Sequence, residues 1–242
     1  MLNNSILTIA QSLMASGTDI GIGSIVYIGC GLASDLAEYR DMAPERIYLV
    51  EPNPELATDL HALVDCDPVL IYLPLAVGKT DGQSHFNIFN HFDICSLATP
   101  NILQKIYPGA RLEASVVVRS VTLPTLINEI VLSQQLPNLL VIEAVGSEGP
   151  IVAALMQSDI AARFGTIVMG LPAEPLFDDS RTPDVLAADM ARMHYQQVAS
   201  DRCSNPDWAR SVFCHIPTLA DRDKTITTLK SSLDDRDKTV TS

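Results

Sequence analysis

Short apolar runs alternate along the chain with segments in which apolar residues recur at every third or fourth position. The runs at 24–29, 46–51, 136–145 and 164–171 are rich enough in apolar residues to be strands buried on both faces of a sheet. Helical spacing predicts helices over 34–41, 54–64, 123–131, 148–157 and 182–195. This alternation predicts an α/β fold, in which helices cover both faces of a mostly parallel sheet.

Further strands are expected outside this regular alternation. Segment 68–77 has the composition of one strand, and a turn beginning at Gly78 leads into an alternating strand that ends near Asn90. Segment 115–123 is another β run, and 195–200 and 208–216 form a closing pair of strands. The link between the closing strands is too short for a parallel crossover, so we expect the last strand to be antiparallel.

The two ends of the chain have patterns of their own. An amphipathic helix is expected over 4–16. LADRDKTI at 219–226 recurs as LDDRDKTV at 233–240, an offset of two heptads, which predicts a coiled-coil helix over 218–242. That helix would form a homo-oligomer or lead to a further module of a longer protein, and the alternative is a solvated single helix. Residues 1–217 are expected to form one domain.

Composition narrows the classes of function. The chain has 242 residues, is 47% hydrophobic and carries a formal charge of −13, which favours a packed domain over a disordered chain. Residues 219–242 contain five acidic and five basic side chains, so the whole excess of negative charge belongs to the preceding residues. A region with this excess of negative charge is a poor binder of nucleic acid or anionic lipid.

Neither a membrane span nor a metal site is expected. No apolar run reaches the roughly 18–20 residues that a membrane-spanning helix needs, and the first residues lack the cationic region of a signal peptide. The five cysteines are widely spaced without a CxxC motif, and the five histidines form no HxxxH motif. This usage argues against a disulfide framework and a metal site, and favours a reducing, cytoplasmic location.

Two features predict a nucleoside cofactor. Gly29-Cys30-Gly31 ends the first predicted strand, where glycine lets the backbone approach a ligand. Glu51 ends the second, 20 residues beyond Gly31, where a carboxylate can accept hydrogen bonds from ribose hydroxyls. Ser34 replaces the third glycine of a dinucleotide motif, which opposes the alternative of an NAD-dependent enzyme. S-adenosylmethionine has no pyrophosphate and does not need that longer cradle.

An ordered set of segments resembles the FkbM-type methyltransferase family. The segments are VYIGCG (26–31), LVEPNP (49–54), LAVGKTDG (75–82) with HFNIF (85–89), CSL (95–97), VTLPTLINE (121–129) and LVIEAVGSE (140–148). The resemblance spans about 25–217. It implies a Rossmann-like, class I methyltransferase fold with seven strands, S-adenosylmethionine as cofactor, and O-methylation of a sugar, glycan or natural-product hydroxyl.

The resemblance also implies a cofactor site. By position in the motifs, the cofactor-binding residues are Gly29, Cys30, Gly31, Glu51, Pro52, Asn53 and Ala76. The chain departs from the family pattern at five positions: Tyr27 replaces an acidic residue, Pro124 and Glu143 each replace an aspartate, Val141 a lysine and Val145 a glutamate. These departures motivate an alternative function, that of a catalytically degenerate domain retained for coiled-coil assembly.

Methyl transfer to oxygen requires alignment of the reacting atoms and removal of a hydroxyl proton. Glu143, at the end of its predicted strand, is the first candidate for positioning or for general base, and the alternative is a carboxylate that caps a nearby loop or helix. His91, in a polar loop, is the second candidate, and the alternative is an ordinary loop histidine. We expect Glu148 to cap a helix and Trp208 to pack.

Overall fold

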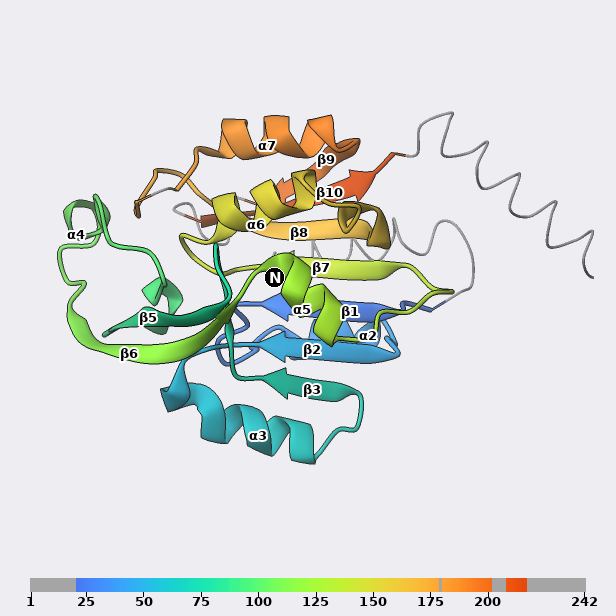
Figure 1. Cartoon of the computed structure of the whole chain (residues 1–242), viewed down its shortest axis with the longest axis horizontal. Coiled ribbons are helices and arrows are strands. Elements are labelled where there is room, and N and C mark those ends of the chain that lie inside the picture. Colours follow the sequence, from blue (N-terminus) through green and yellow to red (C-terminus); the bar gives the residue numbers. More distant parts are fainter. Residues whose placement is uncertain (1–20, 179, 202–207, 217–242) are drawn as a thin grey trace, which may run out of the picture.

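The computed structural model describes residues 21–178, 180–201 and 208–216 (Figure 1). Seven strands form the main sheet in the order β3-β2-β1-β7-β8-β10-β9. Their bounds are β1 Ser24–Ile28, β2 Arg46–Val50, β3 Leu70–Leu73, β7 Asn138–Ile142, β8 Phe164–Pro172, β9 Tyr195–Asp201 and β10 Trp208–His215. The first five run parallel, and β10 is antiparallel to both of its neighbours. The predicted α/β sheet and its antiparallel last strand are confirmed.

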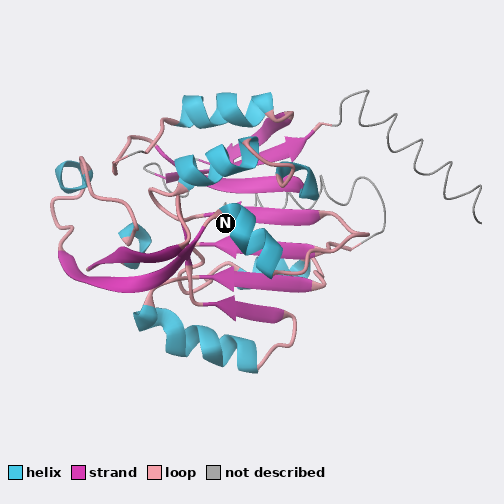
Figure 2. Ribbon diagram, in the orientation of Figure 1, coloured by secondary structure: helices cyan, strands magenta, loops and turns pink. Residues whose placement is uncertain are grey.

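Helices cover both faces of this sheet, as Figure 2 shows. They are α2 Leu36–Asp41, α3 Ala57–Asp65, α5 Leu123–Glu129, α6 Glu148–Met156 and α7 Pro183–Arg192. Successive side chains of a strand point to opposite faces, so β1 contributes to two separate cores. Val26 and Ile28 pack with α5, α6 and α7, whereas Ile25 and Tyr27 pack with α2 and α3.

The expectation of one strand over 68–77 is wrong. Strand β3 ends at Leu73, and after Pro74 the short β4 (Ala76–Val77) pairs with β6 in a different sheet. Proline has no N–H to donate, which interrupts the ladder and lets the chain leave the main sheet. The second sheet has the order β4-β6-β5, with β5 at Gly82–Phe89 and β6 at Leu112–Val121. It projects from one end of the main sheet (Figure 1).

Short helical segments connect these elements. A helix that the sequence analysis did not predict, α4, spans Leu103–Ile106, and 3-10 turns occur at η1 (Pro54–Leu56), η2 (Phe92–Ile94) and η3 (Ala161–Arg163). The predicted helices over 4–16 and 218–242 lie outside the described residues. Within the described part of the chain, no helix has both the length and the apolar character needed to cross a bilayer.

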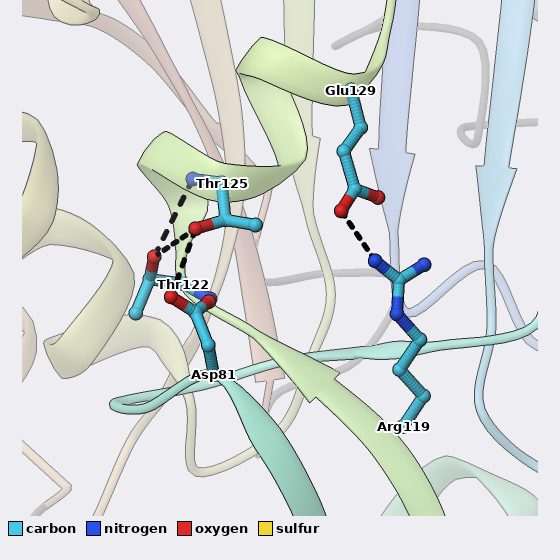
Figure 3. A network of polar contacts seen from close by, with 5 residues as sticks. All are labelled: Asp81, Arg119, Thr122, Thr125 and Glu129. Atoms are coloured by element: carbon cyan, nitrogen blue, oxygen red, sulfur yellow. Dashed lines mark hydrogen bonds and ion pairs between the residues drawn. The ribbon is translucent and has the colours of Figure 1, made fainter.

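A polar network fastens the second sheet to α5 (Figure 3). The Asp81 carboxylate accepts hydrogen bonds from the Thr122 N–H at 2.7 Å and from the Thr125 hydroxyl at 3.0 Å. Thr122 also caps α5 by accepting from the Thr125 N–H. Arg119 of β6 also forms an ion pair with Glu129 of α5. The turn before β5 is thereby attached to the helix that follows β6.

Candidate functional site

A cavity of about 630 Å³ lies where strands β1, β2 and β7 end. Strand β1 is central in the sheet: the chain continues from it to β2 on one side and returns to β7 on the other. Ligands of open α/β sheets bind beyond the carboxyl ends of the strands at such a reversal of strand order. The volume is within the range of small-molecule sites.

The cavity floor, which we define as residues 29–31 together with Glu51, depends on the conformation of two glycines. Gly29 has a φ of +76°, and a Cβ there would lie 2.7 Å from the backbone N of Ala144. Gly31 has a φ of +53°, and no heavy atom lies within 4 Å of the place its Cβ would occupy. Glycine is therefore required sterically at position 29, and at position 31 it leaves open space above the turn.

Glu51 connects the ends of two strands. Its Oε2 accepts a hydrogen bond from the Gly31 N–H and its Oε1 accepts one from the Asn53 N–H, both at 2.9 Å. Burial raises the pKa of Glu51, and these two hydrogen bonds partly oppose that rise. Each carboxylate oxygen keeps lone-pair capacity for a further donor, such as a ligand hydroxyl.

The structure brings most of the predicted site residues to this cavity. Those that line it are Gly29, Cys30, Gly31, Glu51, Pro52, Ala76 and Glu143. Asn53 does not line it: the residue is buried and its side-chain oxygen caps η1 by accepting from the Glu55 N–H. His91 is exposed and does not line the cavity either, whereas the next two residues, Phe92 and Asp93, do.

Glu143 lies between two partners from other strands. The Tyr27 hydroxyl donates to its Oε2 at 2.5 Å, and Arg210 Nε lies 2.5 Å from its Oε1. Arg210 also forms an ion pair with Asp35, through Nη1. We call Tyr27, Asp35, Glu143 and Arg210 the charged wall of the cavity, which they all line.

The surroundings of the charged wall shift the pKa values of Tyr27 and Arg210. Burial, followed by the Glu143 charge, raises the pKa of Tyr27 well above its ordinary value, so the phenol stays neutral. Burial by itself would lower the pKa of Arg210, but Glu143 and the other groups of the wall raise it above the ordinary value. Glu143 therefore faces a neutral donor on one side and a permanent cation on the other.

Sequence reasoning missed the contribution of β10. Arg210 and Trp208 are two residues apart, so both point to the same face of the strand and line the cavity. A Cβ on Gly170 of the neighbouring strand would lie 3.2 Å from the Trp208 ring, so this glycine leaves space for the indole. A charged residue inside an otherwise uncharged strand was the one available signal for Arg210.

Comparisons with known proteins give distant likenesses. No family model and no curated protein matches the sequence. Among solved structures, the methyltransferase FkbM of Methylobacillus flagellatus has 12% identity and a TM-score of 0.47, covering 85% of this chain and 47% of that one. Fibrillarin of Aeropyrum pernix, solved with S-adenosyl-L-methionine, has 14% identity and a TM-score of 0.46, covering 85% and 74%.

Precorrin-6y C5,15-methyltransferase of Geobacter metallireducens has 11% identity and a TM-score of 0.43, with 90% of each chain covered. This chain thus spans about half the length of the FkbM methyltransferase. Likenesses at this distance do not decide an activity, which has to be argued from the cavity itself.

Proposed function

We propose that the cavity binds S-adenosylmethionine and that the protein transfers its methyl group to a hydroxyl of a sugar, glycan or other small molecule. The observation that carries this proposal is the cavity floor. A glycine turn with open space above Gly31 meets the buried Glu51 carboxylate at the reversal of strand order. That combination suits a nucleoside without a pyrophosphate, because Ser34 stands where a dinucleotide motif has its third glycine.

The lining residues fit such a cofactor. Glu51 would accept from the ribose hydroxyls, the backbone at Gly29 and Gly31 permits close approach, and the Glu143 carboxylate suits an ammonium group. When bound, S-adenosylmethionine supplies a methyl group on a positively charged sulfur, which makes that group open to attack by oxygen.

The protein's own part is positioning. Glu143 is held by two partners from different strands, Tyr27 and Arg210, so its carboxylate keeps one orientation. Two such restraints favour a role in orienting bound groups, because a carboxylate in an ion pair is a weak proton acceptor. Asp93, which also lines the cavity, is the proposed proton acceptor for an acceptor hydroxyl.

The same restraint on Glu143 favours a second candidate function. The carboxylate is neutralised by Arg210, and the described lining residues include no histidine. A domain that binds S-adenosylmethionine without transferring the methyl group, and that assembles through the repeat at 218–242, would be consistent with both observations.

Calorimetry with S-adenosylmethionine tests the proposal. We expect the wild type to bind, and Glu51→Ala to bind at least about tenfold more weakly, because the ribose loses a buried acceptor. Glu113→Ala, which removes an exposed carboxylate on β6, is the matched control and should bind like the wild type. Glu51→Gln, checked for native circular dichroism, covers the case in which the alanine variant does not fold.

Three results separate the candidates. Binding together with methyl incorporation into a hydroxyl compound supports the methyltransferase. Binding without incorporation across a broad panel of sugars supports the non-catalytic domain. The absence of heat at millimolar S-adenosylmethionine would contradict both, and a parallel titration with NADH would then test the dinucleotide alternative.

A further inference from the structure

The charged residues that line the cavity are almost all of one sign. Those that the structure describes include five carboxylates and a single cation, Arg210. The carboxylates are Asp35, Glu51, Asp93, Glu143 and Asp201. A concave site with low-dielectric walls focuses the field of such groups, so it concentrates ligands of the opposite charge.

The one lining cation is already engaged. Arg210 Nε lies 2.5 Å from Glu143 Oε1, and its Nη1 pairs with Asp35. These two carboxylates offset the charge of the guanidinium, so it attracts an anionic ligand less than an unpaired arginine would. The charged wall therefore repels phosphate and carboxylate groups despite containing an arginine.

Groups beside the cavity respond to this negative field. Burial, followed by the charge of Glu51, raises the pKa of Cys30 well above its ordinary value. Burial, followed by the charge of Asp35, raises the pKa of Glu38 as well. In both cases a neighbouring carboxylate adds to the cost of forming another negative charge.

The cavity mouth adds aromatic surface next to a carboxylate. Phe92 is 50% exposed and lines the cavity beside Asp93, and Trp208 lines it from β10. Trp208 also packs against the apolar cluster that contains Ile94, the residue after Asp93. Aromatic faces attract cations, and a carboxylate beside them strengthens that attraction.

We infer that the acceptor is a hydroxyl compound that carries a protonated amine, as an amino sugar does, and that acceptors bearing phosphate or carboxylate are excluded. This inference rests on the proposed methyl transfer, because it names the acceptor of that reaction. It does not depend on how tightly S-adenosylmethionine binds, so the two can fail separately.

Trp208 allows a direct test, because it is the only tryptophan of the chain. We would quench its fluorescence with caesium and with iodide at constant ionic strength, and normalise both quenching constants to those of free N-acetyltryptophanamide. The normalised caesium constant should exceed that for iodide by about threefold or more. A ratio at or below one would overturn the inference.

Two variants separate the field of the cavity from the net charge of the whole protein. Asp93→Asn should lower the caesium-to-iodide ratio. Asp65→Asn changes the net charge equally, but at the exposed C-terminal end of α3, and should leave the ratio unchanged. Equal effects of the two variants would show a general charge effect and would overturn the inference.

Methyl transfer by the wild-type protein supplies a second readout. With labelled S-adenosylmethionine, incorporation into glucosamine should exceed that into glucuronate by about tenfold or more. Equal or greater incorporation into glucuronate would contradict the inference while leaving methyl transfer intact. If neither hexose is methylated, the quenching ratio decides alone. If calorimetry detects no binding of S-adenosylmethionine but the caesium ratio is high, the proposed function is refuted and the acceptor with it, whereas the preference of the cavity for cations stands.

Discussion

The cavity floor and the charged wall are built in different ways, although they face the same space. The floor consists of a turn and Glu51, which lies 20 positions after Gly31, and its shape is a property of the backbone at two glycines. The wall joins residues of four segments, and its hydrogen bond from Tyr27 to Glu143 spans 116 positions. A local motif therefore specifies where a ligand can lie, and long-range packing specifies which charges it meets.

The largest expected effect comes from a substitution in the cavity floor. Gly29→Ala should reduce the free energy of unfolding on the order of 4 kcal/mol, because the positive φ is unfavourable for alanine and the new Cβ meets backbone atoms. Gly31→Ala is the matched control and should cost only about 1 kcal/mol, because its Cβ meets nothing within 4 Å. Urea unfolding of both variants measures the difference, and equal costs would contradict the steric account.

The next effect concerns Glu148, which begins α6 directly after the segment that carries Glu143. Burial raises the pKa of Glu148 to about 8, and hydrogen bonds from backbone N–H groups only partly oppose this. Its Oε1 has no hydrogen-bond partner among the described residues. An acid whose pKa is raised on folding binds more protons in the folded state, so stability falls as pH rises from about 4.5 to 8.

Glu148→Gln should remove this dependence. Relative to the wild type, the variant should gain unfolding free energy through that pH interval, on the order of 3 kcal/mol in total, and the gain should level off at higher pH. Chemical denaturation at pH 5, 7 and 9 tests this. A difference between the two proteins that does not change with pH would show that Glu148 is ionised in the folded protein at all three values.

A smaller effect tests the wall. Arg210→Met leaves Glu143 and Asp35 without their cation and should cost about 1–2 kcal/mol, after allowance for the partial exposure of the pair. Adding Glu143→Gln should recover part of that loss, because the uncompensated charge is then removed. A double-mutant cycle measures the coupling. Strictly additive losses would mean that the two side chains do not interact.

The smallest effect provides a baseline outside both regions. Arg119 and Glu129 form an ion pair on the surface with 52% and 39% of their side chains exposed. Glu129→Ala should change the unfolding free energy by less than about 0.5 kcal/mol. Thermal unfolding at low and high salt checks this, and a loss as large as that of Arg210→Met would remove the contrast between exposed and cavity-lining pairs.

Local sequence was sufficient for most of the main sheet. The apolar runs at β1, β2, β7 and β8 are continuous because both faces of these strands are buried, and this leaves a strong signal in the sequence. Pro74 is a local signal for the break between β3 and β4, which the expected strand over 68–77 ran across, and the strand expected over 136–145 is shorter in the structure, at Asn138–Ile142. The short α4 has too few residues for a periodic pattern to identify it.

The cavity floor could also be predicted from the sequence, because its parts are a glycine turn and a carboxylate at the ends of consecutive strands. His91 was not placed correctly at the cavity, since nothing in a loop sequence tells which of three neighbouring residues faces inward. Asn53 fits its motif by position, but its side chain is used to cap η1.

The sequence by itself determined the α/β class, the glycine turn and the place of Glu51, because each depends on residues close together in the chain. Only the tertiary structure decided that Glu143 is held by Tyr27 and Arg210, and that the described residues lining the cavity include one engaged cation and five carboxylates. The physical reason is that charge interacts through space. Its partners are therefore set by the order of strands in the sheet, which no local pattern records.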